Sequence, residues 1–264
     1  MTNYYYVHTG HRIGLDRFRR ACTIIRALGD TDITLLCSDF RIAQIARDFG
    51  VEKSVGIDVV RNIPQIAFHG DKLVFDSDEA NPIMLDDMQK FFSTFIHVEN
   101  SEAIVDEKYF EVKEKTIKIS YFFGDDDYEK DLAKNIDFVK DLEPDLLLGF
   151  YYFLDYEDEL KNEFKQHHEF EDYDEVIQKS QILITASPQA VLENLASGGK
   201  PIYMQREDYI EDFNPLFESL NIPIIKNYEK AKLIDIISNI NTRKYSKLQN
   251  NCNKLVQMIK ENLN

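Results

Sequence analysis

The stretch Ile182–Tyr203 constrains the fold of this chain most, because its pattern predicts a strand, a tight turn, a helix and a second strand in close succession. Ser187 is expected to cap the helix, and Pro188 suits the first helical turn, where a missing N–H costs nothing. The glycine pair at 198–199 is expected to end the helix before the next strand. A unit of this kind is typical of an α/β protein with a mostly parallel sheet.

The start of this expected helix is a candidate anion-binding site. A helix N-terminus that follows a strand presents backbone N–H groups and the positive end of the helix dipole, which favour phosphate groups. Glu193 lies further along the same helix, where its carboxylate could accept hydrogen bonds from the two hydroxyls of a ribose. The spacing alone is equally compatible with an ordinary strand–helix–strand unit in which Glu193 is merely solvated.

Composition argues against several classes of partner. The 264 residues carry a formal net charge of -16, which argues against sequence-independent nucleic-acid binding and against anionic membrane surfaces. No apolar run approaches the roughly 18 residues that a membrane helix needs, and no signal peptide begins the sequence. The three cysteines lack the spacing of a zinc site, so we expect no metal and no cofactor. The expectation is a soluble, cytoplasmic protein.

Strands and helices alternate along both halves of the sequence, which predicts two Rossmann-like domains with mostly parallel sheets. A polar, charged segment at 100–115 separates the halves, so the expected domains are 1–105 and 116–264. Within them, the pattern also predicts a short strand at 65–69 and helices at about 128–142, 156–167 and 245–263. The ligand of such a pair of domains is expected in a cleft between the carboxyl ends of the two sheets.

Arginines are concentrated near the N-terminus of this acidic chain, with five of them within residues 12–26. Arg17 and Arg20 are three apart on a predicted helix and are therefore neighbours on its surface. Two interpretations remain open: a solvated basic face, or an anion-binding patch at the end of the first strand, where α/β folds bind their ligands.

The motif formed by Ser187, Glu193 and the Gly-Lys-Pro-Ile run at 199–202 resembles the donor-nucleotide motif in the C-terminal domain of GT-B glycosyltransferases. It is most similar to that of the UDP-sugar hydrolase of the pseudaminic acid pathway and, more distantly, of MurG-type transferases. The resemblance implies an α/β, GT-B-like fold, in which two Rossmann-like domains face each other across a cleft and the C-terminal helix packs back towards the first. It also implies that Glu193 binds a ribose. Nucleotide contacts are further implied for Thr185, Ser187, Gln189 and Ala190.

Two departures from the family pattern concern the chemistry. Residues 13–20 resemble the hydrolase motif Ile-Gly-x-Gly-His-x-x-Arg, but Arg17 occupies the position of the catalytic histidine. An arginine stays charged at neutral pH and cannot deprotonate a water molecule. The acidic turn Gly124–Asp127 replaces a glycine pair that meets phosphate in the family, and we expect it to form a solvated N-cap and first turn of the next helix.

The loop His8-Thr9-Gly10-His11 offers a substitute, because it resembles the glycine-rich loop after the first strand of MurG-type transferases. His11 is the expected general base, since an imidazole titrates near neutral pH, and His8 is the second candidate. The expected substrate-binding residues are Gly10, Gly14, Arg17 and Arg20.

The main functional hypothesis is sugar transfer from a UDP-linked nucleotide-sugar, with the arginines neutralising anionic groups. A UDP-sugar hydrolase that uses water as the acceptor is one alternative, and a non-catalytic binding protein that keeps the fold is another. The family resemblance implies a role in surface or flagellar glycan biosynthesis. The sequence leaves open the sugar, the acceptor, the choice between a uracil and a cytosine nucleotide, and the oligomeric state.

Overall fold

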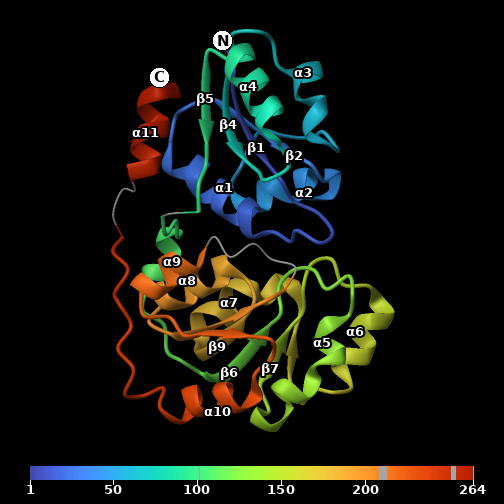
Figure 1. Ribbon diagram of the computed structural model, residues 1–264, viewed down its shortest axis with the longest axis vertical. Coiled ribbons are helices and arrows are strands. Elements are labelled where there is room, and N and C mark those ends of the chain that lie inside the picture. The colour runs from blue at the N-terminus through green and yellow to red at the C-terminus, as the bar shows by residue number, and fades with distance from the viewer. Residues whose placement is uncertain (101, 208–212, 251–253, 264) are drawn as a thin grey trace. The chain divides into compact units, whose positions relative to one another are not determined.

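Figure 1 shows a computed structural model of the chain, which describes all residues except 101, 208–212, 251–253 and 264. The chain forms two compact units, one made of Met1–Ile104 with Asn251–Asn264 and the other of Val105–Asn250. The C-terminal segment thus belongs to the same unit as the N-terminus. None of the described helices has the length and apolar character that a transmembrane span requires.

The first unit contains a five-stranded sheet in the order β3-β2-β1-β4-β5, and all neighbouring strands are parallel. The strands are β1 (Asn3–Val7), β2 (Ile33–Cys37), β3 (Ser54–Gly56), β4 (Lys72–Asp76) and β5 (Thr94–His97). Tyr5 at the centre of β1 pairs with Leu35 of β2 and Val74 of β4. The strand order reverses between β1 and β4, which makes this pair the topological switch point of the sheet.

The α-helices among the described residues of this unit are α1 (Asp16–Ala27), α2 (Phe40–Ile45), α3 (Ile63–Ile66), α4 (Pro82–Phe91) and α11 (Lys254–Leu263). Short 3-10 turns at Ala46–Phe49 and Val60–Asn62 adjoin α2 and α3. The strand expected at 65–69 is wrong, because residues 63–66 form α3 with Pro64 in its first turn, a position that suits proline.

The second unit contains a six-stranded sheet in the order β11-β10-β9-β6-β7-β8, again with parallel neighbours. Its strands are β6 (Ile117–Phe122), β7 (Asp145–Leu147), β8 (His167–His168), β9 (Ser180–Thr185), β10 (Lys200–Gln205) and β11 (Ile224–Lys226). The order reverses between β6 and β9, where Phe122 pairs with Thr185. This pair is the switch point of the second sheet.

The α-helices of the second unit are α5 (Asp131–Lys134), α6 (Leu154–Lys161), α7 (Tyr173–Lys179), α8 (Pro188–Ala196), α9 (Asn214–Ser219) and α10 (Lys230–Ser238). Further 3-10 turns lie at Glu107–Phe110, Ile136–Phe138, Lys140–Leu142 and Phe170–Asp172. The expected continuous helix at 128–142 is wrong. Lys130 has a left-handed φ of 56°, so the helix begins only at Asp131, and the Asn135 side chain donates to the Asp131 carbonyl at 2.9 Å where the helix ends after Lys134.

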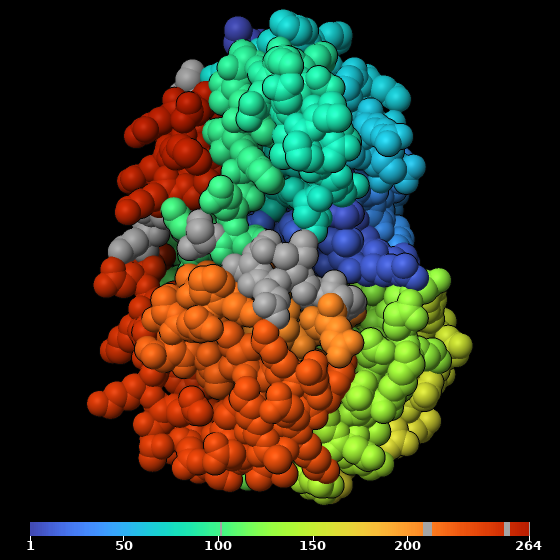
Figure 2. Space-filling view, viewed as in Figure 1, coloured from blue at the N-terminus to red at the C-terminus, as the bar shows by residue number. Residues whose placement is uncertain are grey.

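Two further helix boundaries differ from expectation. α6 ends at Lys161, because His167 and His168 pair with Leu146 and Leu147 as a strand. α11 begins at Lys254, and residues 243–250 run along the surface of the second unit without helix (Figure 2). There Ser246 N donates to the Leu220 carbonyl at 3.0 Å, a tertiary bond that competes with helix formation.

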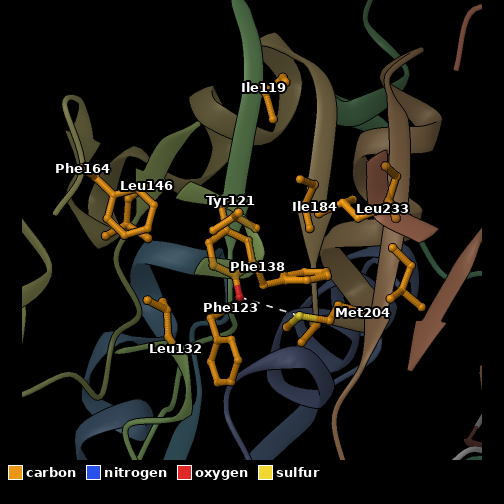
Figure 3. Packing of buried hydrophobic residues seen from close by; sticks show 14 of the residues in the cluster. Ile119, Tyr121, Phe123, Leu132, Phe138, Leu146, Phe164, Ile184, Met204 and Leu233 are labelled. Carbon is orange, nitrogen blue, oxygen red and sulfur yellow. Dashed lines mark hydrogen bonds between the residues drawn. The ribbon is translucent and has the colours of Figure 1, made fainter. Parts of the chain in front are cut away.

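Both faces of the second sheet are covered, as is typical of parallel sheets. On one face, alternating residues of β6, β9 and β10 join the core shown in Figure 3, where the Tyr121 hydroxyl donates to Met204 Sδ at 3.7 Å. On the other face, α7 and α8 pack against Phe122 and Leu183. The side chains at the carboxyl edge are therefore held by a rigid scaffold.

Candidate functional site

The carboxyl edge of the second sheet, at the switch point between β6 and β9, is the first candidate site. Ligands of open α/β sheets bind outside the carboxyl ends of the strands where the strand order reverses. β6 leads here into Phe123 and the turn Gly124–Asp127, and β9 leads into Ala186 and Ser187. The motif singled out in the sequence therefore lies at this edge.

Ser187 caps α8 as expected from the sequence, since its Oγ accepts a hydrogen bond from Ala190 N at 3.1 Å. Ser187 N in turn donates to Thr185 Oγ1 at 3.0 Å, so two hydroxyls fix the turn between β9 and α8. Gln189 and Ala190 complete the first turn, and all four residues are buried. The positive end of the α8 dipole is thereby held at the carboxyl edge.

Glu193 is buried, with 2% of its surface exposed, so the alternative in which it is merely solvated is wrong. Its Oε2 accepts from the Tyr173 hydroxyl at 2.8 Å, and its Oε1 accepts from Gln189 Nε2 at 2.9 Å. Burial, and next the charge of Glu193, raise the pKa of Tyr109 well above its ordinary value. Glu193 thus lies in a buried polar cluster built by α7, α8 and the 3-10 turn Glu107–Phe110.

The acidic turn after β6 differs from expectation, because Asp125, Asp126 and Asp127 are all buried rather than solvated. The carboxylate of Asp127 accepts from the backbone N–H groups of Asp131 at 2.7 Å and Leu132 at 2.9 Å, and from the Tyr156 hydroxyl. Burial raises the pKa of Asp127. This side chain therefore binds the start of α5.

Arg206 is a residue of this edge that the sequence analysis did not identify. It follows β10 directly, and its guanidinium carbon lies 4.6 Å from the centroid of the Phe123 ring. Its Nη1 donates to the Asp126 carbonyl at 2.7 Å. The sequence could have indicated Arg206 by its position directly after a predicted strand. Its contact with the turn after β6 depends on the strand order, which the sequence does not give.

A second candidate site lies at the carboxyl edge of the first sheet, between β1 and β4. Asp76, the last residue of β4, is completely buried and accepts from the Tyr5 hydroxyl and from Arg20 Nε, each at 3.0 Å, and from Arg20 Nη2. Arg17 lies 3.2 Å from Asp78 and 3.8 Å from Asp76. A solvated basic face is therefore wrong for Arg20, whose charge is balanced inside the unit.

The structure gives the two candidate histidines different surroundings. His8 follows β1, with Nδ1 3.0 Å from Asp78 Oδ1 and Nε2 3.7 Å from Glu79 Oε1. The hydrogen bond with His8, and then the charge of Arg17, hold the pKa of Asp78 well below its usual range. His11 instead lies 3.3 Å from the guanidinium of Arg41. The sequence prediction placed His11 first, whereas it is His8 that lies between carboxylates.

The loop that carries both histidines depends on two glycines. Gly10 has a φ of 141° and Gly14 a φ of 76°, backbone conformations that side chains disfavour. Gly14 N donates to the Gly10 carbonyl at 2.9 Å, and Thr9 Oγ1 donates to the Gly14 carbonyl at 3.0 Å. Gly10 and Gly14 thus close a tight turn after the carboxyl end of β1.

Metal binding finds no support in the side-chain geometry of the described residues. Across the chain outside 101, 208–212, 251–253 and 264, no group of three or more His, Cys, Asp or Glu side chains is arranged to hold a metal ion.

Comparison with family models and with curated proteins found no match. Similar solved structures include a UDP-GlcNAc 2-epimerase from Methanocaldococcus jannaschii in complex with UDP-GlcNAc and UDP, with a TM-score of 0.61 and 11% identity over 99% of this chain and 100% of the epimerase chain. MurG from Acinetobacter baumannii gives a TM-score of 0.54 and 10% identity over 99% of each chain.

A third structure, the spinosyn rhamnosyltransferase SpnG with spinosyn aglycone, gives a TM-score of 0.57 and 8% identity over 99% of this chain and 96% of SpnG. Structural similarity at sequence identities this low establishes a shared fold and no more. The two parallel sheets, of five and six strands, have the same architecture as these enzymes. The chain therefore has the GT-B fold, as its sequence motif implied.

Proposed function

We propose that the chain is a nucleotide-sugar-dependent glycosyltransferase whose donor nucleotide binds at the carboxyl edge of the second sheet. The observation that carries this proposal is the combination of a capped helix start at Ser187 with the buried carboxylate of Glu193 at the switch point between β6 and β9. Phosphate oxygens suit the helix start, and ribose hydroxyls suit the carboxylate. Two solved structures of the same fold are described as a UDP-GlcNAc 2-epimerase and a rhamnosyltransferase, which supports the same class here.

In this proposal the donor diphosphate lies at the first turn of α8, near the backbone of Ser187, Gln189 and Ala190. Glu193 accepts hydrogen bonds from the ribose. Tyr173 and Gln189 hold its two oxygens in a fixed orientation, so the carboxylate is ordered before the ligand arrives. UDP is the proposed nucleotide.

His8 is the proposed general base of the transfer. The acceptor hydroxyl oxygen attacks the anomeric carbon, the bond from that carbon to the diphosphate breaks, and the hydroxyl proton passes to His8 Nε2. Nδ1 of His8 donates to the Asp78 carboxylate, which fixes the orientation of the imidazole. His11 lies beside the guanidinium of Arg41, whereas a carboxylate orients His8, so His8 is the proposed base.

A UDP-sugar hydrolase related to the pseudaminic acid pathway enzyme is the second candidate. The observation that favours it is the same His8–Asp78 pair, which can activate a water molecule as well as an acceptor hydroxyl. The two candidates differ in their products. The transferase releases UDP only when an acceptor is added, whereas the hydrolase releases UDP and free sugar in water alone.

The first experiment is calorimetric titration of UDP and CMP into the wild type, Glu193→Gln and Glu175→Gln. We expect the wild type to bind UDP and Glu193→Gln to bind it about ten- to hundredfold more weakly, the range for a hydrogen bond to a charged group. Glu175 is an exposed carboxylate of α7, so its variant serves as the matched control and should bind UDP like the wild type. A wild type that binds neither nucleotide would contradict the proposal.

A second assay separates the bases and the reaction classes. UDP release from UDP-sugars is measured with and without added acceptors, for wild type, His8→Ala and His11→Ala. We expect a loss of about a hundredfold or more for His8→Ala, the contribution of a general base, and a much smaller change for His11→Ala. Full activity of His8→Ala would remove His8 from the mechanism.

A further inference from the structure

Arg206 lies where a cation would act on the proposed donor site. Its backbone follows β10, and β10 adjoins β9, whose carboxyl end leads into the α8 turn. Its side chain contacts the turn after β6, on the other side of β9, through the Asp126 carbonyl and the Phe123 ring. The side chain therefore joins the strand on one side of β9 to the turn on the other side, at the carboxyl edge where β9 leads into the start of α8.

The guanidinium is held in this position rather than extended into solvent. Arg206 is 5% exposed, and the Phe123 ring and the Asp126 carbonyl fix its plane and one of its N–H groups. Its charge reaches the surrounding side chains: burial raises the pKa of Tyr152, and Arg206 opposes that rise. A charge in such a dry, fixed setting acts more strongly than one in water.

The proposed donor site needs a cation, because the turn after β6 carries three buried carboxylates that would repel a diphosphate. We infer that Arg206 is the residue that binds the donor diphosphate, together with the start of α8. A guanidinium suits this task, since its planar array of donors matches phosphate oxygens and stays charged at all relevant pH values. The inference rests on the proposed function and adds to it a side chain that binds the diphosphate.

The test is calorimetric titration of UDP, uridine and inorganic pyrophosphate into the wild type, Arg206→Lys, Arg206→Met and Lys118→Met. Lys118 is an exposed lysine near the start of β6, so its variant removes the same charge away from the carboxyl edge. We expect Arg206→Met to weaken UDP and pyrophosphate binding about ten- to hundredfold and to leave uridine binding unchanged. Arg206→Lys should retain part of the lost affinity, and Lys118→Met should match the wild type.

Circular dichroism and thermal unfolding show whether each variant is folded. A folded Arg206→Met that binds UDP like the wild type overturns the inference and leaves the proposed function intact. Equal losses for UDP and uridine also overturn it, because they indicate damage to the whole site. If Arg206→Met does not fold, the folded Arg206→Lys variant tests the inference instead. Unchanged affinity of that variant for pyrophosphate and UDP overturns the inference.

The inference and the proposed function fail in different ways. A wild type that binds neither UDP nor pyrophosphate contradicts both. Suppose that binding of UDP and pyrophosphate depends on Arg206, but no UDP is released from any UDP-sugar, in water or with acceptors. This result supports Arg206 as a phosphate-binding residue and contradicts the proposed enzymatic activity.

Discussion

The carboxyl edges of the two sheets have the same type of strand order and different chemistry. At the edge between β1 and β4, Asp76 and Asp78 are balanced by the cations Arg17 and Arg20. At the edge between β6 and β9, the buried carboxylates of Glu193 and Asp127 are held by tyrosine hydroxyls, an amide and backbone N–H groups.

The two settings change carboxylate chemistry in opposite directions. The bond with His8 holds the pKa of Asp78 down, whereas burial raises the pKa of Asp127. One topology can thus carry carboxylates that are paired with cations or carboxylates whose hydrogen-bond donors are neutral groups. The side chains after each strand, rather than the sheet, determine which of the two is present.

The first prediction tests whether the ion pairs at the edge between β1 and β4 stabilise the protein. Asp76→Ala leaves the buried Arg20 without its partner, so we expect a loss of about 3–5 kcal/mol in the free energy of unfolding, measured by urea titration. Asp32→Ala is the matched control, because Asp32 pairs with Lys53 at the surface and should cost at most about 1 kcal/mol. Similar losses for the two variants would show that the buried network does not stabilise the first unit.

The second edge is tested by removing a hydroxyl. Tyr173→Phe deletes the donor to Glu193 Oε2, and we expect a loss of about 1.5–3 kcal/mol in the free energy of unfolding, the range for a hydrogen bond to a charged group. Tyr245→Phe removes a bond to the neutral Pro201 carbonyl and should cost only about 0.5–1.5 kcal/mol. A Tyr245→Phe loss equal to or above that of Tyr173→Phe would contradict the role of the hydroxyl at Glu193.

The smallest expected effect is the pH dependence of stability, in which Asp78 and Asp127 should act with opposite signs. The lowered pKa of Asp78 means that its contribution to stability is present above about pH 4, the unfolded value, and is lost as the pH falls towards the folded value. The raised pKa of Asp127 means that its contribution is largest below about pH 4 and is lost as the pH rises through the folded value.

Urea midpoints of wild type, Asp78→Asn and Asp127→Asn between about pH 3 and pH 7 check both signs. We expect the advantage of the wild type over Asp78→Asn to shrink at the acidic end, and its advantage over Asp127→Asn to shrink towards neutral pH. Parallel curves for the two variants would show that the two carboxylates do not differ as the structure indicates.

Local signals predicted much of the fold. The strand, Ser187 cap and helix of the 182–203 stretch are confirmed, because cap and stop residues act within one turn of the chain. The helices expected at 128–142 and 245–263 are longer than those formed. The first begins only after Lys130, which is in a left-handed conformation, and Ser246, which was expected in the second, donates instead to Leu220; local periodicity reveals neither.

The candidate sites were predictable in position and not in contacts. The sequence placed Glu193 on the correct helix, and the structure alone shows its burial against Tyr173. The sequence expected the Gly124–Asp127 turn to be solvated and missed Arg206, since both depend on neighbours supplied by other strands. The proposal of His8 as the base rests on its contact with Asp78, which lies 70 residues further along the sequence.

The sequence by itself determined the α/β class, the parallel sheets and the chemical groups that follow each strand, because periodicity, caps and turns are properties of neighbouring residues. Only the tertiary structure decided which of these groups meet. Arg20 and Asp76 are 56 residues apart and bind each other because β1 pairs with β4. Arg206 reaches the turn after β6 because β9 lies between β10 and β6. Strand order follows from burial of the whole core, which no local pattern encodes.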